Sequence, residues 1–259
     1  MISSLYKNLP HDTESRLQNA LSKGLSDNTT GQMQIFFRAD DIGVPGKQFS
    51  QLIALFRQYT LPICLAVVPT WITQDRLTVL QQETGTGQEQ WCWHQHGWLH
   101  RNYETIGKKQ EFGSARSAEL QFADLQKGKE RLQKILGNNF SPFFTPPWNR
   151  CSGETLEALQ KLHFQAVSRS NNATPLPPPG LPDLQVNIDL HTRKEADPVI
   201  CLDKLLTEIS TGIANGTGGI MIHHQRMNQT AFDFLALLLK SICAEPKLHP
   251  VLFQDLLQT

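Results

Sequence analysis

The feature that most constrains the fold is an alternation of apolar runs with helical patterns. Residues 35–37 (Ile-Phe-Phe) form an apolar run, and residues 49–59 place four large apolar side chains at the spacing of one helix face. A second apolar run at 61–68 is nearly continuous, as is typical of a parallel strand that is covered on both faces. A strand, a helix and a strand in this order predict a βαβ unit.

The alternation continues along the chain. Further strands are predicted at 90–93, 143–145, 164–168, 184–190, 218–222 and 249–253, and further helices at 117–136, 152–162, 198–214 and 230–244. The sequence has no internal repeat and no linker, which favours one α/β domain with a parallel sheet, either barrel-like or doubly wound. Residues 1–31 are predicted to be an N-terminal extension with a short helix at 15–25, and residues 32–259 to form the main domain.

Composition excludes several classes of function. The chain is 39% hydrophobic and 19% charged with a formal net charge of zero, so nothing favours binding to nucleic acid or to an anionic membrane. No apolar run approaches the roughly 18 residues of a membrane span, and no signal peptide is evident, so a cytoplasmic location is expected. Five scattered cysteines without CxxC spacing are expected to be buried free thiols.

Two adjacent carboxylates, Asp40 and Asp41, follow the first apolar run. Neighbouring side chains on a regular strand point to opposite faces. Both carboxylates can therefore face one site only if the strand ends and the backbone turns, which Gly43, Pro45 and Gly46 permit. The alternative is that the two residues cap a turn or the next helix.

The other predicted strand ends also carry polar side chains. Six of the nine histidines lie at or just after such ends, namely His94, His96, His100, His191, His223 and His224. Parallel α/β folds collect their chemistry at the carboxyl ends of their strands. The histidines and the paired aspartates are therefore predicted to meet on one face.

His96 and His100 are four residues apart, a separation that places two imidazoles on one face of a helical turn and lets both bind one metal ion. With one carboxylate they form a set that suits Zn²⁺ in a catalytic site or Fe²⁺ in a facial triad. His94 is the alternative second histidine. The second aspartate favours a hydrolase, because a hydrolase needs a general base beside the metal-bound water.

These motifs resemble those of the polysaccharide deacetylase superfamily (NodB homology, carbohydrate esterase family 4-like), over most of the chain. The matching segments are Arg38–Asp41 for the first motif, His96–His100 for the second, Phe144–Trp148 for the third and Ile220–His223 for the fifth. Pro147–Arg150 and the histidine pair resemble one bacterial branch of this superfamily. The resemblance implies a single-domain distorted (β/α) barrel with about seven parallel strands, and makes residues 32–259 its catalytic domain.

The resemblance also implies roles. Asp40 is expected to be the general base, and His223 the general acid, with His224 as the alternative acid. Metal ligands are expected to be Asp41, His96 and His100. Trp98, Pro147 and Trp148 are expected to line the substrate groove, and plain core packing is the alternative for both tryptophans.

Two positions depart from the family pattern. Thr145 stands where the third motif usually has an arginine that orients the catalytic aspartate, and Arg150 or Arg38 is expected to take over that role. The fourth motif usually pairs an aspartate with a tryptophan. Its nearest equivalent here has Asp189, which is expected to support the catalytic histidine, and no tryptophan.

The combined prediction is a metal-dependent hydrolase that removes an acyl group from an N- or O-acylated carbohydrate or related small molecule. Zn²⁺ is the expected cofactor, with Co²⁺, Ni²⁺ or Fe²⁺ as alternatives. Two other interpretations are an inactive metal-binding family member and another metalloenzyme with the same triad, such as an oxygenase. A soluble or precursor-linked acylated sugar is the expected partner, and the oligomeric state is left open.

Overall fold

The computed structural model describes residues 2–85 and 88–258. Met1 belongs to the predicted N-terminal extension (1–31) and Thr259 to the predicted main domain (32–259), and both lie outside the described residues. The chain divides into two compact units. Unit 1 comprises the residues up to Ala39, then Gly46–Ile63 and Val186 onward, and unit 2 comprises Asp40–Pro45 and Cys64–Gln185.

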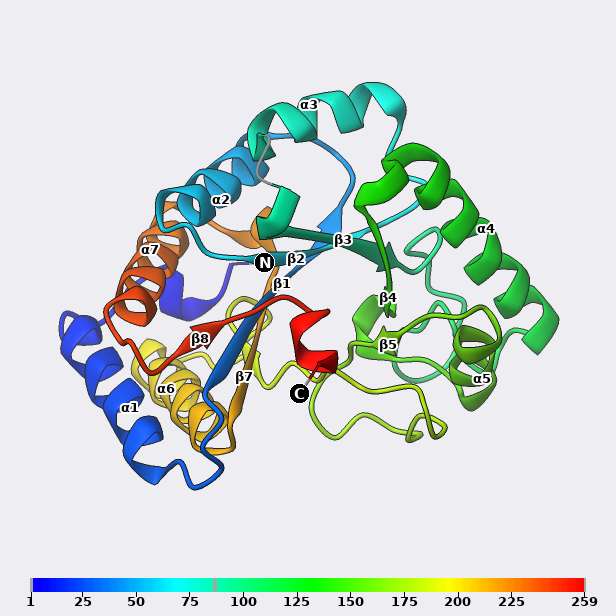
Figure 1. The fold of residues 1–259 in the computed structure, drawn as a ribbon. Helices are drawn as coiled ribbons and strands as arrows, with labels where there is room; N and C mark the ends of the chain where they lie inside the picture. Colours follow the sequence, from blue (N-terminus) through cyan, green and yellow to red (C-terminus); the bar gives the residue numbers. More distant parts are fainter. Residues whose placement is uncertain (1, 86–87, 259) are drawn as a thin grey trace. The chain divides into compact units, whose positions relative to one another are not determined.

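Unit 1 contains the first part of β1 and a group of helices (Figure 1). Its elements are η1 (Ser4–Tyr6), α1 (Thr13–Asp27), β1 (Gln34–Ile42, as far as Ala39), α2 (Lys47–Gln58), β6 (Ile188–Asp189), α6 (Pro198–Ala214), β7 (Thr217–Ile222), η5 (His224–Arg226), α7 (Gln229–Cys243), β8 (His249–Pro250) and η6 (Asp255–Leu257). Strand β7 pairs in parallel with β1 and with β6, and β8 pairs in parallel with β1.

Helix α6 shows how sequence fixes an element of unit 1. The Asp197 side chain accepts the N–H groups of Val199 and Ile200, and Pro198 occupies the first helical position, where its missing N–H costs no hydrogen bond. Helix α1 packs against α6 (Figure 1). Gly24 of α1 permits this approach, because a Cβ there would lie 2.7 Å from the carbonyl oxygen of Ser210.

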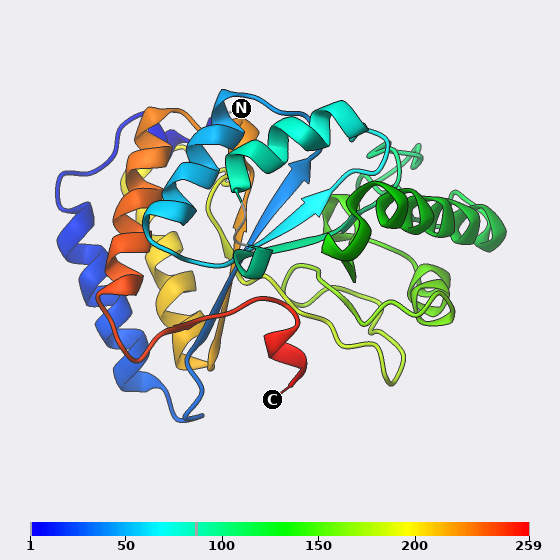
Figure 2. The same ribbon diagram turned by 45° about the horizontal axis from the view of Figure 1, so that its top comes forward.

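Unit 2 contains the end of β1 and the strands and helices of residues 64–185 (Figure 2). Its elements are the end of β1, β2 (Ile63–Val67, from Cys64), α3 (Gln74–Thr84), η2 (Gln88–Gln90), β3 (Trp91–His96), α4 (Ala118–Leu136), η3 (Gly137–Asn139), β4 (Phe140–Thr145), η4 (Pro147–Asn149), α5 (Gly153–Lys161) and β5 (Ala166–Val167). Its strands follow the order β5-β4-β3-β2, and β4 pairs in parallel with both β3 and β5.

A hydrophobic cluster anchors the helices of unit 2 to its strands. Helix α4 packs against β3, β4 and α5, and Leu125 of α4 meets Phe144 of β4 and Leu159 of α5 in this cluster. Because β3 and β4 both end beside this packed core, the residues that follow them start from fixed positions. Those residues build the candidate site.

The predicted fold class, an α/β distorted barrel with about seven parallel strands, is confirmed. The five cysteines are free, as expected, although Cys243 is exposed and not buried. Among the described residues, no helix combines the length and the apolar character that crossing a membrane requires. The division into an extension (1–31) and a main domain (32–259) stays a prediction.

Some elements differ from the predicted ones. Helix α3 was not expected, because only Leu77, Leu80 and Thr84 of its residues are buried and the pattern is weak. The strand expected at 184–190 is confined to Ile188–Asp189, and the one at 249–253 to His249–Pro250. In these segments most of the apolar residues pack without making regular strand pairings.

A candidate metal centre

Asp40 and Asp41 reach their positions through one unusual backbone conformation. Strand β1 continues to Ile42, so the expectation that the strand must end for both carboxylates to face one site is wrong. Asp41 instead has a φ of 63°, in the left-handed region that Asp and Asn visit more readily than most other residues. At this residue, side chains no longer alternate strictly between the two faces of the strand. Asp40 is almost fully buried, and 18% of the Asp41 side chain is exposed.

His96 and His100 lie close together, although not on a helix as their spacing predicted. His96 is the last residue of β3, and His100 lies in the loop that follows. Gly97 and His100 have φ values of 61° and 56°. These two left-handed residues turn the chain back. The loop therefore brings the two imidazoles together, as a helical turn was expected to do.

The two imidazoles share one carboxylate oxygen. The Oδ1 atom of Asp41 is 3.1 Å from Nε2 of His100 and 3.4 Å from Nε2 of His96. One candidate ligand atom from each of the three residues lies within 4.8 Å of the other two. Three such atoms at this separation can surround a single cation, and all three residues belong to unit 2.

A hydrogen bond orients His96. Its Nδ1 lies 2.9 Å from the carbonyl oxygen of Thr145, an acceptor only, so Nδ1 carries a proton and Nε2 presents a lone pair in the neutral ring. His94 has a different environment, since its Nε2 contacts the Thr145 hydroxyl at 2.9 Å and its Nδ1 contacts the Cys92 carbonyl. His94 is not part of the group of candidate ligands, so the alternative that made it a ligand gains no support.

The pKa values of His96 and His100 shift in opposite directions. Burial lowers the pKa of His96, but the Asp41 and Asp40 carboxylates and the Thr145 carbonyl outweigh it and raise the pKa overall. Burial and the neighbouring His96 lower the pKa of His100 to about 4. In the absence of a cation the acidic groups therefore favour a proton on His96, and a cation would have to displace that proton.

Aromatic rings surround His100. The ring of Trp148 lies 4.6 Å from that of His100 between centroids, and the ring of Trp71 lies 5.6 Å from it. Trp98, the other predicted groove residue, packs against the hydrophobic cluster of unit 2, which agrees with the core-packing alternative. Trp71 was missed, and its position just after a predicted strand was the only sequence signal.

Two further predicted residues of unit 2 have defined contacts. Pro147 is buried and lies against Gly97, where a Cβ would come within 2.6 Å of the proline ring. The Arg150 guanidinium donates a hydrogen bond to the Lys109 carbonyl at 3.3 Å. Neither contact tests the expectation that Arg150 replaces the missing arginine.

Glu111 was missed by sequence reasoning. It is fully buried and its carboxylate accepts the backbone N–H groups of Trp98, Leu99 and His100. It is one of two glutamates in the polar segment 101–117 and belongs to no motif or periodic pattern, so no sequence signal points to it.

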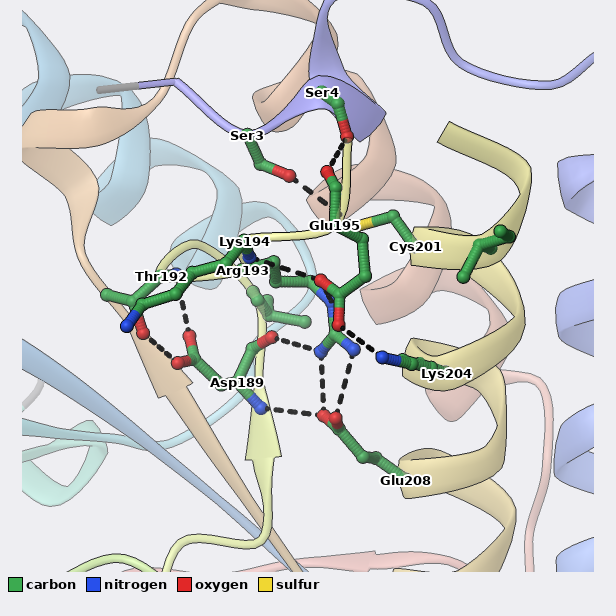
Figure 3. Close-up of polar contacts among 12 residues, drawn as sticks. Ser3, Ser4, Asp189, Thr192, Arg193, Lys194, Glu195, Cys201, Lys204 and Glu208 are labelled. Atoms are coloured by element: carbon green, nitrogen blue, oxygen red, sulfur yellow. Dashed lines mark hydrogen bonds and ion pairs between the residues drawn. The ribbon is translucent and has the colours of Figure 1, made fainter. Parts of the chain in front are cut away.

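The remaining predicted residues belong to unit 1. The Asp189 carboxylate accepts hydrogen bonds from the Thr192 N–H and the Thr192 hydroxyl (Figure 3). It also accepts the His191 N–H, and so caps the turn after β6. Arg193 in turn donates to the Asp189 carbonyl and to Glu208 (Figure 3). These contacts show how Asp189 holds its own turn.

The two histidines after β7 have different surroundings within unit 1. His223 donates its backbone N–H to Nδ1 of His191 at 3.1 Å. His224 is buried and its ring meets Phe49 edge-on at 6.1 Å between centroids. Arg38, the other candidate to replace the arginine, is fully buried and its Nη2 lies 3.1 Å from the Met221 sulfur.

Comparison with known proteins gives structural neighbours only. No protein-family model matches the chain, and no curated protein matches it. A putative polysaccharide deacetylase from Mycobacterium smegmatis has a similar structure, with a TM-score of 0.65 and 12% identity over 89% of this chain and 91% of that one.

Two other neighbours belong to carbohydrate esterase family 4. The Xyl-CE4 domain of a xylanase from the hindgut metagenome of Trinervitermes trinervoides has a TM-score of 0.58 and 12% identity, over 88% of this chain and 90% of that one. A mutant family 4 pseudoenzyme with restored activity, whose wild type is from Bacillus anthracis, has a TM-score of 0.55 and 10% identity, over 87% and 68%. The predicted resemblance to polysaccharide deacetylases is thus confirmed at the level of the fold.

Proposed function

We propose that this chain is a metal-dependent deacetylase that hydrolyses an N- or O-acyl group of a carbohydrate or a related small molecule. The observation that carries the proposal is the convergence of Asp41, His96 and His100 around one point, with the buried Asp40 next to Asp41 in the chain. A structural neighbour of the same fold that is described as a putative polysaccharide deacetylase supports the reaction class.

The three residues suit a divalent cation. Two imidazole nitrogens and one carboxylate oxygen form a donor set that Zn²⁺ accepts in catalytic sites and that leaves coordination positions open. The Thr145 carbonyl already fixes the His96 ring so that Nε2 faces Asp41. We infer Zn²⁺ as the resident ion, with Co²⁺, Ni²⁺ and Fe²⁺ as ions that the same donors accept.

When bound, such a cation would polarise an acyl carbonyl and lower the pKa of water. Asp40 then serves as the general base that takes the proton of the attacking water. Its burial keeps it away from bulk solvent, and a positioned general base contributes about 10²–10⁴-fold to the rate. Asp41, with its side chain directed at the two imidazoles, serves as a ligand and not as a base.

His223 is our candidate for the general acid that protonates the leaving amine or alcohol. Its backbone is held by His191, while the neighbouring His224 is buried against Phe49. This difference supports His223 over His224. Asp189 is tied to its own turn, so we assign it to the support of the segment that carries His191.

An acylated sugar is the substrate class that the surroundings favour. The Trp148 ring beside His100 offers an apolar surface on which a sugar ring can stack. One structural neighbour is a domain of a xylanase and another is a family 4 carbohydrate esterase in complex with acetate, which supports an acetylated carbohydrate.

An inactive, metal-binding role is the second candidate. A family 4 pseudoenzyme from Bacillus anthracis is among the structural neighbours, so this fold also occurs without activity. The presence here of both the three candidate ligands and Asp40 favours the enzyme.

Acetate release tests the two candidates against each other. Protein stripped with a chelator and then reloaded with Zn²⁺ is incubated with N-acetylglucosamine oligomers and with acetylated xylo-oligosaccharides. We expect acetate from the reloaded protein and none from the stripped protein or from Asp41→Asn. Protein that binds Zn²⁺ but releases no acetate from any acylated sugar would support the inactive role instead.

A further inference from the structure

The Glu111 carboxylate binds the backbone of the loop between the two candidate histidine ligands. The Oε2 atom of Glu111 accepts the N–H groups of Trp98 and His100, both at 3.2 Å, and its Oε1 atom accepts the N–H of Leu99 at 2.6 Å. Three consecutive backbone N–H groups that point at one anion form a concave binding site of the kind known as a nest. Here the anion comes from the chain itself.

The shape of this loop depends on the carboxylate. Gly97 adopts a φ of 61°, and a Cβ at this position would lie 2.2 Å from Oε2 of Glu111. His100 also has a positive φ, a strained conformation that a non-glycine residue keeps only where its surroundings hold it there. The hydrogen bond from the His100 N–H to Glu111 is such a restraint.

Glu111 is itself firmly held. The adjacent residue Phe112 forms a parallel bridge with Cys151, and its carbonyl accepts the N–H of Ser152 at 2.8 Å. On the other side, the Gln110 carbonyl accepts the N–H of Tyr103 at 3.0 Å. The carboxylate therefore projects from a fixed piece of backbone, and it lies in the same unit as the candidate ligands.

We propose that Glu111 is a positioning residue that fixes the 97–100 loop, so that His100 is preorganised to bind the cation together with Asp41 and His96. This inference rests on the proposed function, because it assumes that the three residues bind a metal ion. Glu111 contacts the ligand through its backbone N–H and does not touch the coordinating nitrogen.

A carboxylate suits this task better than its amide counterpart. Both oxygens of Glu111 act as acceptors, and Oε2 accepts two of the three N–H groups. In Glu111→Gln an NH₂ group replaces one of the two carboxylate oxygens. That NH₂ group would then face a backbone N–H, so that two hydrogen-bond donors would point at each other. The loop would have to move, and with it His100.

Metal affinity tests the proposal directly. Zn²⁺ binding is measured by competition with a chromogenic chelator for the wild type, Glu111→Gln, Glu111→Asp and the matched control Glu104→Gln. Glu104 lies in the same segment, and its carboxylate accepts the Ala115 N–H in place of an N–H of the 97–100 loop. The Co²⁺ absorption spectrum reports the coordination geometry, and circular dichroism reports the fold.

We expect Glu111→Gln to bind Zn²⁺ about 10–100-fold more weakly than the wild type with an altered Co²⁺ spectrum, as is typical when a partner of a ligand is lost. Glu111→Asp should retain part of the affinity, and Glu104→Gln should bind as the wild type does. Unchanged Zn²⁺ affinity and an unchanged Co²⁺ spectrum in a folded Glu111→Gln would overturn the role of Glu111 but not the proposed function. A wild type without Zn²⁺ affinity would overturn the proposed function as well.

Hydrogen exchange on the wild type covers the case in which the variant does not fold. If Glu111 holds the loop before metal arrives, the amides of Trp98, Leu99 and His100 should exchange slowly in metal-free protein. Rapid exchange of these three amides, beside slow exchange in β3, would contradict preorganisation by Glu111.

Discussion

The Thr145 carbonyl oxygen lies 2.9 Å from Nδ1 of His96, and this backbone contact directs the other ring nitrogen of His96 toward Asp41. Because the contact uses the backbone, it does not depend on which side chain stands at position 145. The Thr145 hydroxyl has a separate partner, Nε2 of His94, at 2.9 Å. A single residue therefore orients one candidate ligand with its main chain and a buried neighbour with its side chain.

Thr145→Val separates these two roles. The substitution removes the hydroxyl that contacts buried His94 and leaves the carbonyl that orients His96. We expect the free energy of unfolding to fall by about 1–3 kcal/mol, measured by urea denaturation, while Zn²⁺ affinity stays near that of the wild type. Thr145→Ser is the control, since it keeps the hydroxyl. A large loss of Zn²⁺ affinity in Thr145→Val would show that the side chain also positions the ligand.

Asp40→Asn tests the assignment of the base. Asparagine cannot accept a proton from water, so we expect the turnover number for deacetylation of the sugar to fall by about 10²–10⁴-fold. Bound Zn²⁺, measured by elemental analysis, should remain near one ion per chain because Asp41 is intact. Wild-type turnover in Asp40→Asn would rule out Asp40 as the base.

Removal of metal should lower stability. A ligand that binds only the folded state stabilises it in proportion to the logarithm of its concentration, by about 4 kcal/mol at a thousand times Kd. We therefore expect Tm of the wild type to fall on addition of a chelator and to recover with excess Zn²⁺. Asp41→Asn should show a much smaller change, and an equal Zn²⁺-dependent rise in Asp41→Asn would place the stabilising ion elsewhere.

His191 should make stability depend on pH. Burial, and then the nearby His223, His224 and Arg226, hold the pKa of His191 well below its ordinary value. The unfolded chain therefore binds this proton more readily than the folded chain. Stability should fall as the pH drops through about 6.5, by at most about 1.4 kcal/mol per pH unit from this residue.

The variant His191→Asn tests this dependence, with denaturation measured between about pH 5 and 8. Asparagine has an acceptor for the His223 N–H but does not titrate. The free energy of unfolding of His191→Asn should therefore change less steeply with pH than that of the wild type. His249→Gln is the control, because His249 is exposed and its replacement should leave the slope unchanged. Equal slopes in the wild type and His191→Asn would refute the prediction.

The candidate ligands could be predicted because general rules apply to them. Polar residues after buried strands meet at one edge of a parallel sheet, and this rule brings the aspartates and histidines together. The spacing of His96 and His100 then indicates a metal-binding pair, and the resemblance to polysaccharide deacetylases implies Asp41 as the third ligand. The local geometry could not be predicted in the same way. Left-handed backbone at Asp41 and at His100 is a conformation that no side chain of those types demands, and the surrounding residues impose it.

Glu111 and helix α3 show why the rest was out of reach. Ten residues of irregular chain (101–110) separate Glu111 from the loop it closes, and only the folded backbone brings its carboxylate to the Leu99 N–H. Helix α3 has a mostly polar sequence and is held by few buried side chains. Each depends on tertiary contacts, which local periodicity does not encode.

Asp41, His96 and His100 should together hold one divalent cation, and the proposed chemistry depends on that ion. Crystals of the wild type grown with Zn²⁺, with anomalous diffraction recorded at the zinc absorption edge, test this binding most directly. We predict one strong anomalous peak about 2.0–2.2 Å from Nε2 of His96, Nε2 of His100 and a carboxylate oxygen of Asp41. No peak among these three side chains in zinc-saturated crystals, or a zinc ion bound only by other residues, would contradict it.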